Sequence, residues 1–234
     1  VAELLARAGL PAGAFNVVTG TGTEVGAPLV AHPMVRHVTF TGSCVSGINV
    51  MRAAAANVTS VLPELGGKSP VVVLADANLE AAVDGIIGAI FENAGQICSA
   101  GSRLVVERKV HDELLDRLVA RARRLTLGHG LRRPDMGPVN SLAQLEKIRG
   151  FVDRAVARGR HVVTGGKVTR DPETGLGFFF EPTIIDDVPS DDELVQEEIF
   201  GPVLTVQVVD DAEEAVAAAN ATRFALVAGV YTRD

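Results

Sequence analysis

Residues 70–107, PVVVLADANLEAAVDGIIGAIFENAGQICSAGSRLVVE, decide the fold. The stretch begins with a short apolar run at 70–74 and ends with another at 103–107, and runs of this length bounded by turn residues predict buried strands. Between them, residues 78–91 carry apolar side chains at helical spacing. A strand, a helix and a second strand in this order predict a βαβ unit with parallel strands.

The same alternation extends along the chain and predicts an α/β fold with a mostly parallel sheet. Sheet patterning restarts after Gly66-Gly67, which predicts a boundary between residues 1–66 and residues 67–234. Further strands are expected at 14–18, 36–40, 58–65, 182–186, 202–209 and 226–232, and further helices at 24–31, 43–56, 110–124, 141–158 and 211–220.

The composition is that of a globular protein that can bury a sizeable core without disulfides. Of its 234 residues, 47% are hydrophobic and 22% are charged. The net charge of −7 and the lack of a basic stripe argue against binding to nucleic acid. The basic piece RARR, residues 121–124, is better explained as the solvated end of a helix.

Cysteine usage indicates a reducing compartment, and we expect a cytoplasmic location. The two cysteines, Cys44 and Cys98, make no disulfide framework. No charged leader precedes an apolar run, and no run approaches the roughly 18 residues of a membrane span. Because the sequence begins inside a helical pattern and ends in a strand pattern, we expect it to be an internal segment of a longer chain.

Two glycine-bearing turns suggest a place for a phosphate group. GTGTEVG, residues 20–26, follows a predicted strand and opens a helix, although its glycine spacing is one residue longer than the usual dinucleotide fingerprint. FTGS, residues 40–43, repeats the arrangement. Two such turns favour a cofactor crevice at neighbouring strand ends. The alternatives are a plain βα turn for the first, and an N-cap role of Ser43 for the second.

Three further motifs carry groups that could perform chemistry. In PELGGKSP, residues 63–70, Glu64 is either a general base or a carboxylate at a strand end. In NAGQICSAGSR, residues 93–103, small neighbours leave Cys98 approachable as a nucleophile, and the alternative is an inert small apolar residue. In EEIFGPV, residues 197–203, the two acids could bind a sugar hydroxyl and the phenylalanine could pack against a flat ring. The alternative is a surface loop.

Taken together, FTGS, ELGGKSP, GQIC and EEIFGP, in this order, resemble the NAD(P)-dependent aldehyde dehydrogenase superfamily. The resemblance covers essentially the whole chain. It implies that residues 1–66 are the C-terminal part of a Rossmann-like NAD(P)-binding domain. Residues 67–234 would be an α/β catalytic domain that bears the thiol and is truncated at its C-terminal end.

The resemblance also implies roles for individual residues. Cys98 would be the nucleophile that attacks an aldehyde, and Glu64 the base that activates water on the resulting thioester. NAD is the expected cofactor, with NADP left open, and no metal is expected. The implied cofactor-binding residues are Gly22, Gly26, Phe40, Thr41, Gly42, Ser43, Gly47, Leu65, Gly66, Glu198 and Phe200, and the implied substrate-pocket residues are Asn93 and Ile97, with Gln96 shaping the same loop.

Some features depart from the family pattern or have no assigned role. After FTGS the chain continues Cys44-Val45-Ser46-Gly47, which puts Ser46 at a position where the family has an apolar residue near the adenine. Cys44 and Lys68 have no implied role. Three alternatives stay open: a CoA-acylating relative, a non-catalytic homologue of the same fold, and an inactive segment of a working enzyme. We expect the complete chain to form a homodimer or homotetramer and to act on a small-molecule aldehyde.

Overall fold

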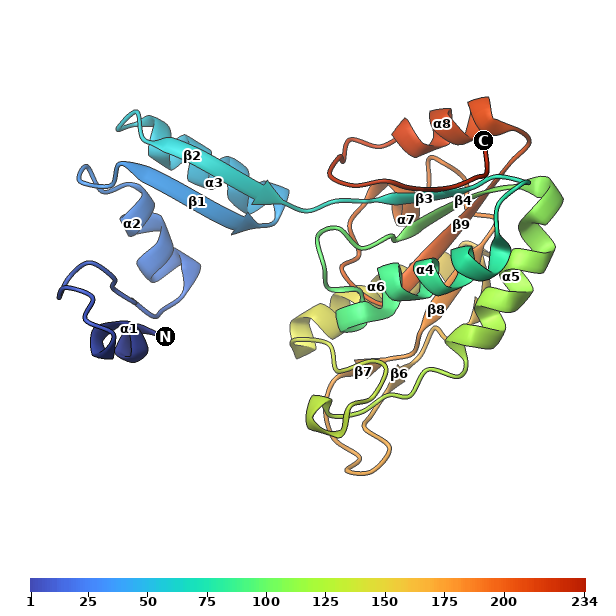
Figure 1. The fold of residues 1–234 in the computed structure, drawn as a ribbon, viewed down its shortest axis with the longest axis horizontal. Helices are drawn as coiled ribbons and strands as arrows, with labels where there is room; N and C mark the ends of the chain where they lie inside the picture. Colours follow the sequence, from blue (N-terminus) through green and yellow to red (C-terminus); the bar gives the residue numbers. More distant parts are fainter. The chain divides into compact units, whose positions relative to one another are not determined.

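The computed structural model describes all residues, 1–234, and the chain divides into two compact units, Val1–Leu65 and Gly66–Asp234 (Figure 1). The assignment of these units to a cofactor-binding domain and a catalytic domain stays a prediction. The first unit contains α1 (Ala2–Arg7), η1 (Gly22–Gly26), α2 (Ala27–Val30), β1 (His37–Gly42), α3 (Cys44–Ala55) and β2 (Ser60–Leu65).

Strands β1 and β2 of the first unit are parallel, and α3 connects them. The helix starts after Ser43, whose Oγ accepts the Ser46 N–H at 3.2 Å, so the predicted N-cap is confirmed. The helix then lies close on β2, because a Cβ added to Gly47 would come 2.4 Å from the Leu65 side chain. The predicted elements at 36–40, 43–56 and 58–65 are therefore confirmed.

The predicted strand at 14–18 is wrong. These residues have no regular structure, and no strand of the chain pairs with them. Phe15, Val17 and Val18 are 45%, 62% and 69% exposed. Apolar residues of this kind favour a strand only where neighbouring strands and a packed face receive them. The glycine turn that follows therefore does not begin at the end of a strand.

The second unit is built on a six-stranded sheet with the order β10-β3-β4-β9-β8-β5. All neighbouring strands are parallel except β5 and β8, so the predicted α/β fold with a mostly parallel sheet is confirmed. The strands are β3 (Pro70–Val73), β4 (Arg103–Glu107), β5 (His161–Thr164), β8 (Thr183–Asp186), β9 (Val203–Val209) and β10 (Gly229–Tyr231), and the main helices are α4 (Leu79–Phe91), α5 (Arg108–Ala122), α6 (Leu142–Ala157) and α8 (Ala212–Asn220).

Alternate side chains of the central strands enter different layers of the core. Val71 and Leu104 belong to the apolar cluster that contains α4 and α5, whereas Val72 and Val105 pack with α8. Helix α6 belongs to a third cluster with β8. Continuous apolar strands are typical of a parallel sheet covered on both faces, and the layers are visible in Figure 1.

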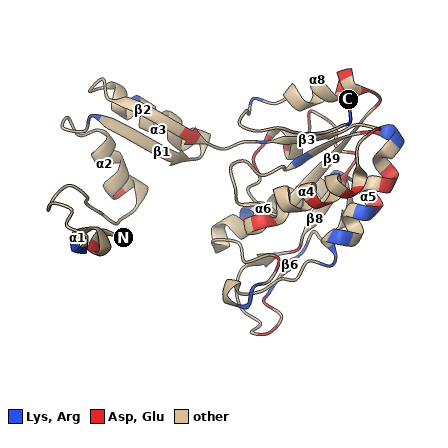
Figure 2. Cartoon of the chain, in the orientation of Figure 1, with Lys and Arg blue, Asp and Glu red and all other residues tan.

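Among the strands and α-helices, four short elements were not predicted: β5, the two-stranded pair β6 (Val168–Thr169) and β7 (Phe179–Phe180), and α7 (Glu193–Gln196). Strands and helices this short carry too few residues to show a period. The RARR piece lies at the end of α5, as expected, and opposite charges are mixed along this helix (Figure 2). None of the helices combines the length and the apolar composition needed to cross a bilayer.

Candidate active site

In the first unit, several predicted cofactor residues and the predicted base lie at the C-terminal ends of the parallel strands β1 and β2. The parallel register sets Thr41 opposite Glu64 and Gly42 opposite Leu65. Ser43 and the N-terminus of α3 follow at the same end. The carboxyl ends of parallel strands followed by a helix N-terminus are where α/β folds bind cofactors.

The side chains at this end differ in exposure. Glu64 and Thr41 are exposed to solvent, whereas Phe40 and Leu65 are half-buried. The ring of Phe40 lies against Gly42, where a Cβ would come 2.6 Å from Cζ. A general base needs access to water, and the exposure of Glu64 within the first unit is compatible with that role.

The first glycine turn forms a short π-helical turn, Gly22–Gly26, that leads into α2. Thr21 caps it, because its Oγ1 accepts the Glu24 N–H at 3.2 Å and lies 2.8 Å from Glu24 Oε2. Gly22 is exposed and Gly26 is half-buried. The turn leaves the Gly22 backbone open to a ligand, but its cap is complete without one.

In the second unit, the loop that carries Cys98 starts from a strained backbone after α4. Asn93, Ala94 and Gly95 have φ values of 49°, 55° and 70°. Three consecutive residues in the left-handed region are costly outside glycine, and strain of this kind clusters at functional sites. A Cβ on Gly95 would lie 2.1 Å from the carbonyl oxygen of Gly201, so this loop packs directly on the EEIFGP turn.

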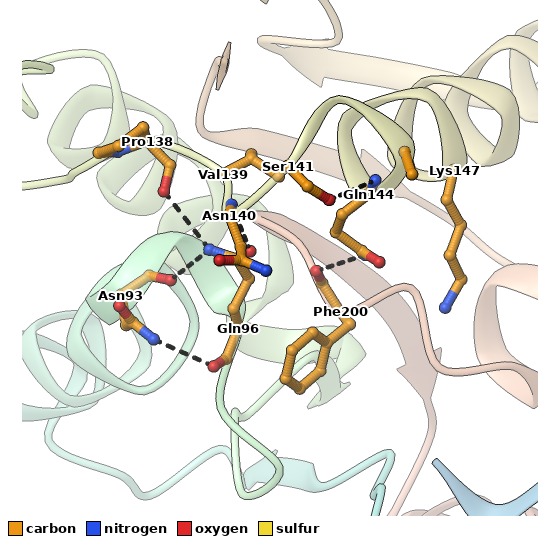
Figure 3. Close-up of a pocket in the computed structure, with 10 residues that line it drawn as sticks. Asn93, Gln96, Pro138, Val139, Asn140, Ser141, Gln144, Lys147 and Phe200 are labelled. Atoms are coloured by element: carbon orange, nitrogen blue, oxygen red, sulfur yellow. Dashed lines mark hydrogen bonds between the residues drawn. The ribbon is translucent and has the colours of Figure 1, made fainter. Parts of the chain in front are cut away.

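Side-chain hydrogen bonds hold this loop in place (Figure 3). The Asn93 side chain donates to the Gln96 carbonyl at 3.1 Å, and the Gln96 side chain donates back to the Asn93 carbonyl at 3.1 Å. Gln96 also accepts the Asn140 N–H at 2.9 Å. Asn93 and Gln96 thus hold the loop conformation through reciprocal hydrogen bonds, and their roles toward a substrate stay predictions.

Cys98 is half-buried and its thiol is free. Its N–H forms no hydrogen bond within the chain, which leaves this donor available. Its carbonyl oxygen lies against Gly67, where a Cβ would come within 2.6 Å. The other cysteine, Cys44, is also half-buried and free, so exposure does not distinguish the two thiols.

Glu198 also contacts the Gly66-Gly67 backbone. The Gly67 N–H donates to Glu198 Oε1 at 3.1 Å, and a Cβ on Gly66 would come 2.2 Å from Oε2. Burial raises the pKa of Glu198 above its ordinary value, against the hydrogen bond from Gly67 and the charges of Lys147 and Lys68, which lower it. The predicted Gly66 and its neighbour Gly67, which the sequence did not single out as a site residue, thus both lie against this carboxylate.

Two residues of α6 that the sequence did not single out support the Glu198–Phe200 segment. Gln144 donates to the carbonyl groups of Ile199 and Phe200, each at 2.9 Å. Lys147 donates to the Glu198 carbonyl at 3.0 Å. Phe200 has a φ of 58°, so its backbone conformation depends on such support. The sequence did not indicate this supporting role, because Gln144 and Lys147 read as ordinary polar residues on the solvent face of an amphipathic helix.

Phe200 borders two cavities. The larger, of about 850 Å³, is lined by polar and apolar groups of the Cys98 loop, of residues 138–147 and of Phe200 itself (Figure 3). The smaller, of about 10 Å³, is lined by Gly67, Ile97 and Glu198 among others. The structure therefore brings Asn93 to the larger cavity, and Ile97 to the smaller one, which is about the size of a single water.

The chain belongs to the aldehyde dehydrogenase family, whose sequence pattern it matches over residues 1–234. It is 44% identical to the betaine aldehyde dehydrogenase of Bacillus subtilis (strain 168) and 42% identical to the (Z)-2-((N-methylformamido)methylene)-5-hydroxybutyrolactone dehydrogenase of Acinetobacter baylyi, over 100% of this chain and 48% and 47% of those proteins.

The fold is also that of solved family members. A crystal structure of betaine aldehyde dehydrogenase from Staphylococcus aureus in complex with NAD+ matches with a TM-score of 0.94 at 39% identity, over 99% of this chain and 46% of that one. The chain thus spans about half the length of the relatives it matches.

Proposed function

We propose that this chain forms part of an enzyme that oxidises an aldehyde to a carboxylic acid with NAD(P)+, and that Cys98 is its nucleophile. The observation that carries the proposal is the contact of Gly67 with both Cys98 and Glu198. It sets the thiol loop beside a half-buried carboxylate and an aromatic ring, next to a cavity of about 850 Å³.

The residues present fit a nicotinamide cofactor. Ribose hydroxyl groups need acceptors, and Glu198 has one carboxylate oxygen engaged by Gly67 and a second that accepts no hydrogen bond from the chain. Phe200 supplies a flat apolar face beside it. In the first unit, Gly42, Ser43 and the N-terminus of α3 would receive phosphate groups. NAD is the proposed cofactor, since the related S. aureus enzyme was crystallised with NAD+.

The proposed reaction uses the Cys98 thiolate twice, first as a nucleophile and then as a leaving group. The Cys98 thiolate adds to the aldehyde carbonyl carbon, and the free N–H of Cys98 is a donor for the oxyanion that forms. When bound, NAD(P)+ supplies the acceptor for the hydride that leaves this carbon. The thioester left on Cys98 is then attacked by water, from which Glu64 removes a proton, and the thiolate leaves as the acid is released.

Substrate choice is proposed only at the level of class. The two relatives are named for different substrates, betaine aldehyde and a substituted hydroxybutyrolactone. A CoA-acylating reaction would use Cys98 in the same way but would pass the acyl group to a thiol, and the exposed Glu64 of an intact ELGG motif favours hydrolysis. We further propose a cytoplasmic location, in line with two free cysteines, and assembly of the complete polypeptide as a homodimer or homotetramer.

The experiment is an activity screen of the complete polypeptide that contains this chain. A panel of small aldehydes, betaine aldehyde included, is offered with NAD+ and with NADP+, and NADH or NADPH is followed at the same time as the acid product. Cys98→Ala should abolish turnover, whereas Cys44→Ser should retain it. Turnover that survives Cys98→Ala, or formation of acyl-CoA in place of the acid when coenzyme A is added to the assay, would overturn the proposal.

A further inference from the structure

Lys68, the third residue of GGK, is an unusual lysine. Its side chain is 1% exposed, and neither its Nζ nor the Oγ of Ser69 has a hydrogen-bond partner in the chain. Buried lysines are rare and are normally paired. Since a methionine or leucine would fill the same space without a buried charge, the ammonium group calls for a role that an apolar side chain cannot perform.

The backbone at Lys68 is held by the side chain of a second buried cation. The buried Arg103 donates from Nε to the Lys68 carbonyl at 2.9 Å. The same guanidinium group donates to the carbonyls of Ala218 and Ala219 at 2.9 Å and 2.7 Å, at the end of α8. Lys68 is therefore anchored between β3, β4 and α8.

The charges that act on Lys68 are few. Arg103 and Lys147 repel its ammonium group, and Glu198 is the one carboxylate that attracts it. The attraction is mutual, because Lys68 also favours the ionised form of Glu198, in addition to the larger contributions of the Gly67 hydrogen bond and of Lys147. The two residues are joined structurally as well, since the residue before Lys68, Gly67, donates its N–H to Glu198.

We propose that Lys68 is a positioning residue whose buried ammonium group keeps the Glu198 carboxylate ionised, so that it can accept the ribose hydroxyl groups of the cofactor. This inference rests on the proposed function, and it adds a role for a residue that the mechanism leaves unused. A protonated Glu198 would have an O–H of its own and fewer acceptor sites, and would bind a hydroxyl group less well.

The range of pH in which Lys68 acts follows from two pKa values. Burial, together with the repulsion by Arg103, lowers the pKa of Lys68 to about 7. Lys68 is therefore charged at acidic pH, which is where Glu198, with a pKa raised from 4.5 by burial, would gain a proton. The positive charge is present in the range in which it keeps Glu198 ionised.

The test measures the dissociation constant of NAD+ by calorimetry, from acidic to mildly alkaline pH, in the complete polypeptide. Lys68→Met removes the charge with little change of volume. We expect the acidic midpoint, below which NAD+ binding weakens, to move upward by roughly one pH unit, as expected for the loss of a nearby opposite charge. Lys167→Met, which removes an exposed lysine of the same unit, should leave the midpoint in place.

A second pair of variants assigns the effect to Glu198. Glu198→Gln should remove this acidic midpoint, and Lys68→Met should then produce no further shift in the double variant. An unchanged midpoint in Lys68→Met, or an equal shift in the Glu198→Gln background, would overturn the inference. So would failure of both Lys68→Met and Lys68→Gln to fold while Lys68→Arg folds, because the charge would then be structural. Failure of the parent to bind NAD+ at any pH would instead refute the proposed function.

Discussion

The N–H of Gly67 donates to Glu198 Oε1 at 3.1 Å, across 131 residues of sequence. The same glycine lies against the carbonyl oxygen of Cys98, which would be 2.6 Å from an added Cβ. One backbone position thus connects the proposed nucleophile with the proposed ribose acceptor. A side chain at this position would press on the Cys98 carbonyl, which makes Gly67 a sensitive test of how the second unit is assembled.

Gly67→Ala should lower kcat/KM for aldehyde oxidation by about 10²-fold, because a misplacement of about 1 Å near the reacting atoms typically costs that much. The contacts are with backbone atoms, the carbonyl oxygens of Cys98 and Ala225, which cannot move aside as a flexible side chain would. Steady-state kinetics of the complete polypeptide, with its thermal midpoint measured alongside, are the appropriate assay.

The matched control is Gly88→Ala. Gly88 lies in α4 and is exposed, and an added Cβ meets nothing within 4 Å. This variant should keep full activity and gain about 0.5–1 kcal/mol of stability from the helix propensity of alanine. Equal activity of Gly67→Ala and the parent would contradict the close packing described for the thiol loop.

Gln144→Leu should weaken NAD+ binding more than it slows the chemical step. The variant leaves the carbonyls of Ile199 and Phe200 without their donor and loosens the segment that presents Glu198. Loss of the two hydrogen bonds should also lower the free energy of unfolding by about 1–2 kcal/mol. The KM for NAD+ and kcat are measured separately, and a fall in kcat with an unchanged KM would argue against this role.

Asn220→Leu is the control for that variant. Asn220 also donates an amide N–H to a backbone carbonyl, that of Val216 at 2.8 Å, on α8. It should lose stability to a smaller degree and keep the parent's KM for NAD+. A similar rise in KM in both variants would show that general loosening, and not the support of Glu198, is responsible.

His111 should make stability depend on pH. Burial disfavours its charged form, but hydrogen bonds from its ring to Asp186 and Asp112, at 2.9 Å and 2.7 Å, outweigh this effect and raise its pKa above 6.5. Because the pKa of His111 is higher in the folded than in the unfolded chain, its protonation adds to the free energy of unfolding. This contribution is fully present below the unfolded-state pKa of 6.5 and is lost as the pH rises through the folded-state pKa.

The measurement compares the free energy of unfolding of the parent with that of His111→Gln, which keeps hydrogen-bonding groups but does not titrate. The advantage of the parent should be largest at mildly acidic pH and should shrink at alkaline pH. An advantage that is constant with pH, or that grows toward alkaline pH, would show that the imidazolium is not favoured by Asp186.

The sequence predicted the parts of the fold that have a clear period and a packed environment. The strand 103–107 was placed to the residue, and α4, α6 and α8 to within about a residue, because their apolar side chains repeat at helical spacing. The strand expected at 14–18 failed because its apolar residues have no neighbouring strand in this chain. The antiparallel edge strand β5 was missed because its four residues, one exposed and three half-buried, show no distinct alternation.

For the candidate site too, some residues could be predicted from the sequence and others could not. Motifs identified Cys98, Glu64 and Glu198, and these assignments stay predictions. Gln144, Lys147 and Arg103 were missed because their roles come from contacts with carbonyl groups far away in sequence. A helix pattern or a strand pattern predicts which face a residue occupies, but not which distant backbone atom it meets. The isolation of the Lys68 ammonium group is visible only once the surrounding strands are in place.

The central claim is that Cys98 carries the acyl group and Glu64 releases it. Glu64→Gln keeps the size and the hydrogen bonding of the side chain but removes the base, and positioned base catalysis is typically worth roughly 10²–10⁴-fold. In the complete polypeptide, this variant should give a burst of about one NADH per active site, because the thioester intermediate forms only once. Steady-state turnover of the variant should then be slower than that of the parent by roughly 10²–10⁴-fold.

The most direct measurement is the mass of the peptide that contains Cys98 in the Glu64→Gln variant, quenched after the burst with aldehyde and NAD+. The account predicts that Cys98 carries the acyl group, with a stoichiometry that matches the burst, and that Cys44 is unmodified. A burst with no acyl group on Cys98, an acyl group on another residue, or unchanged steady-state turnover of the variant would contradict it.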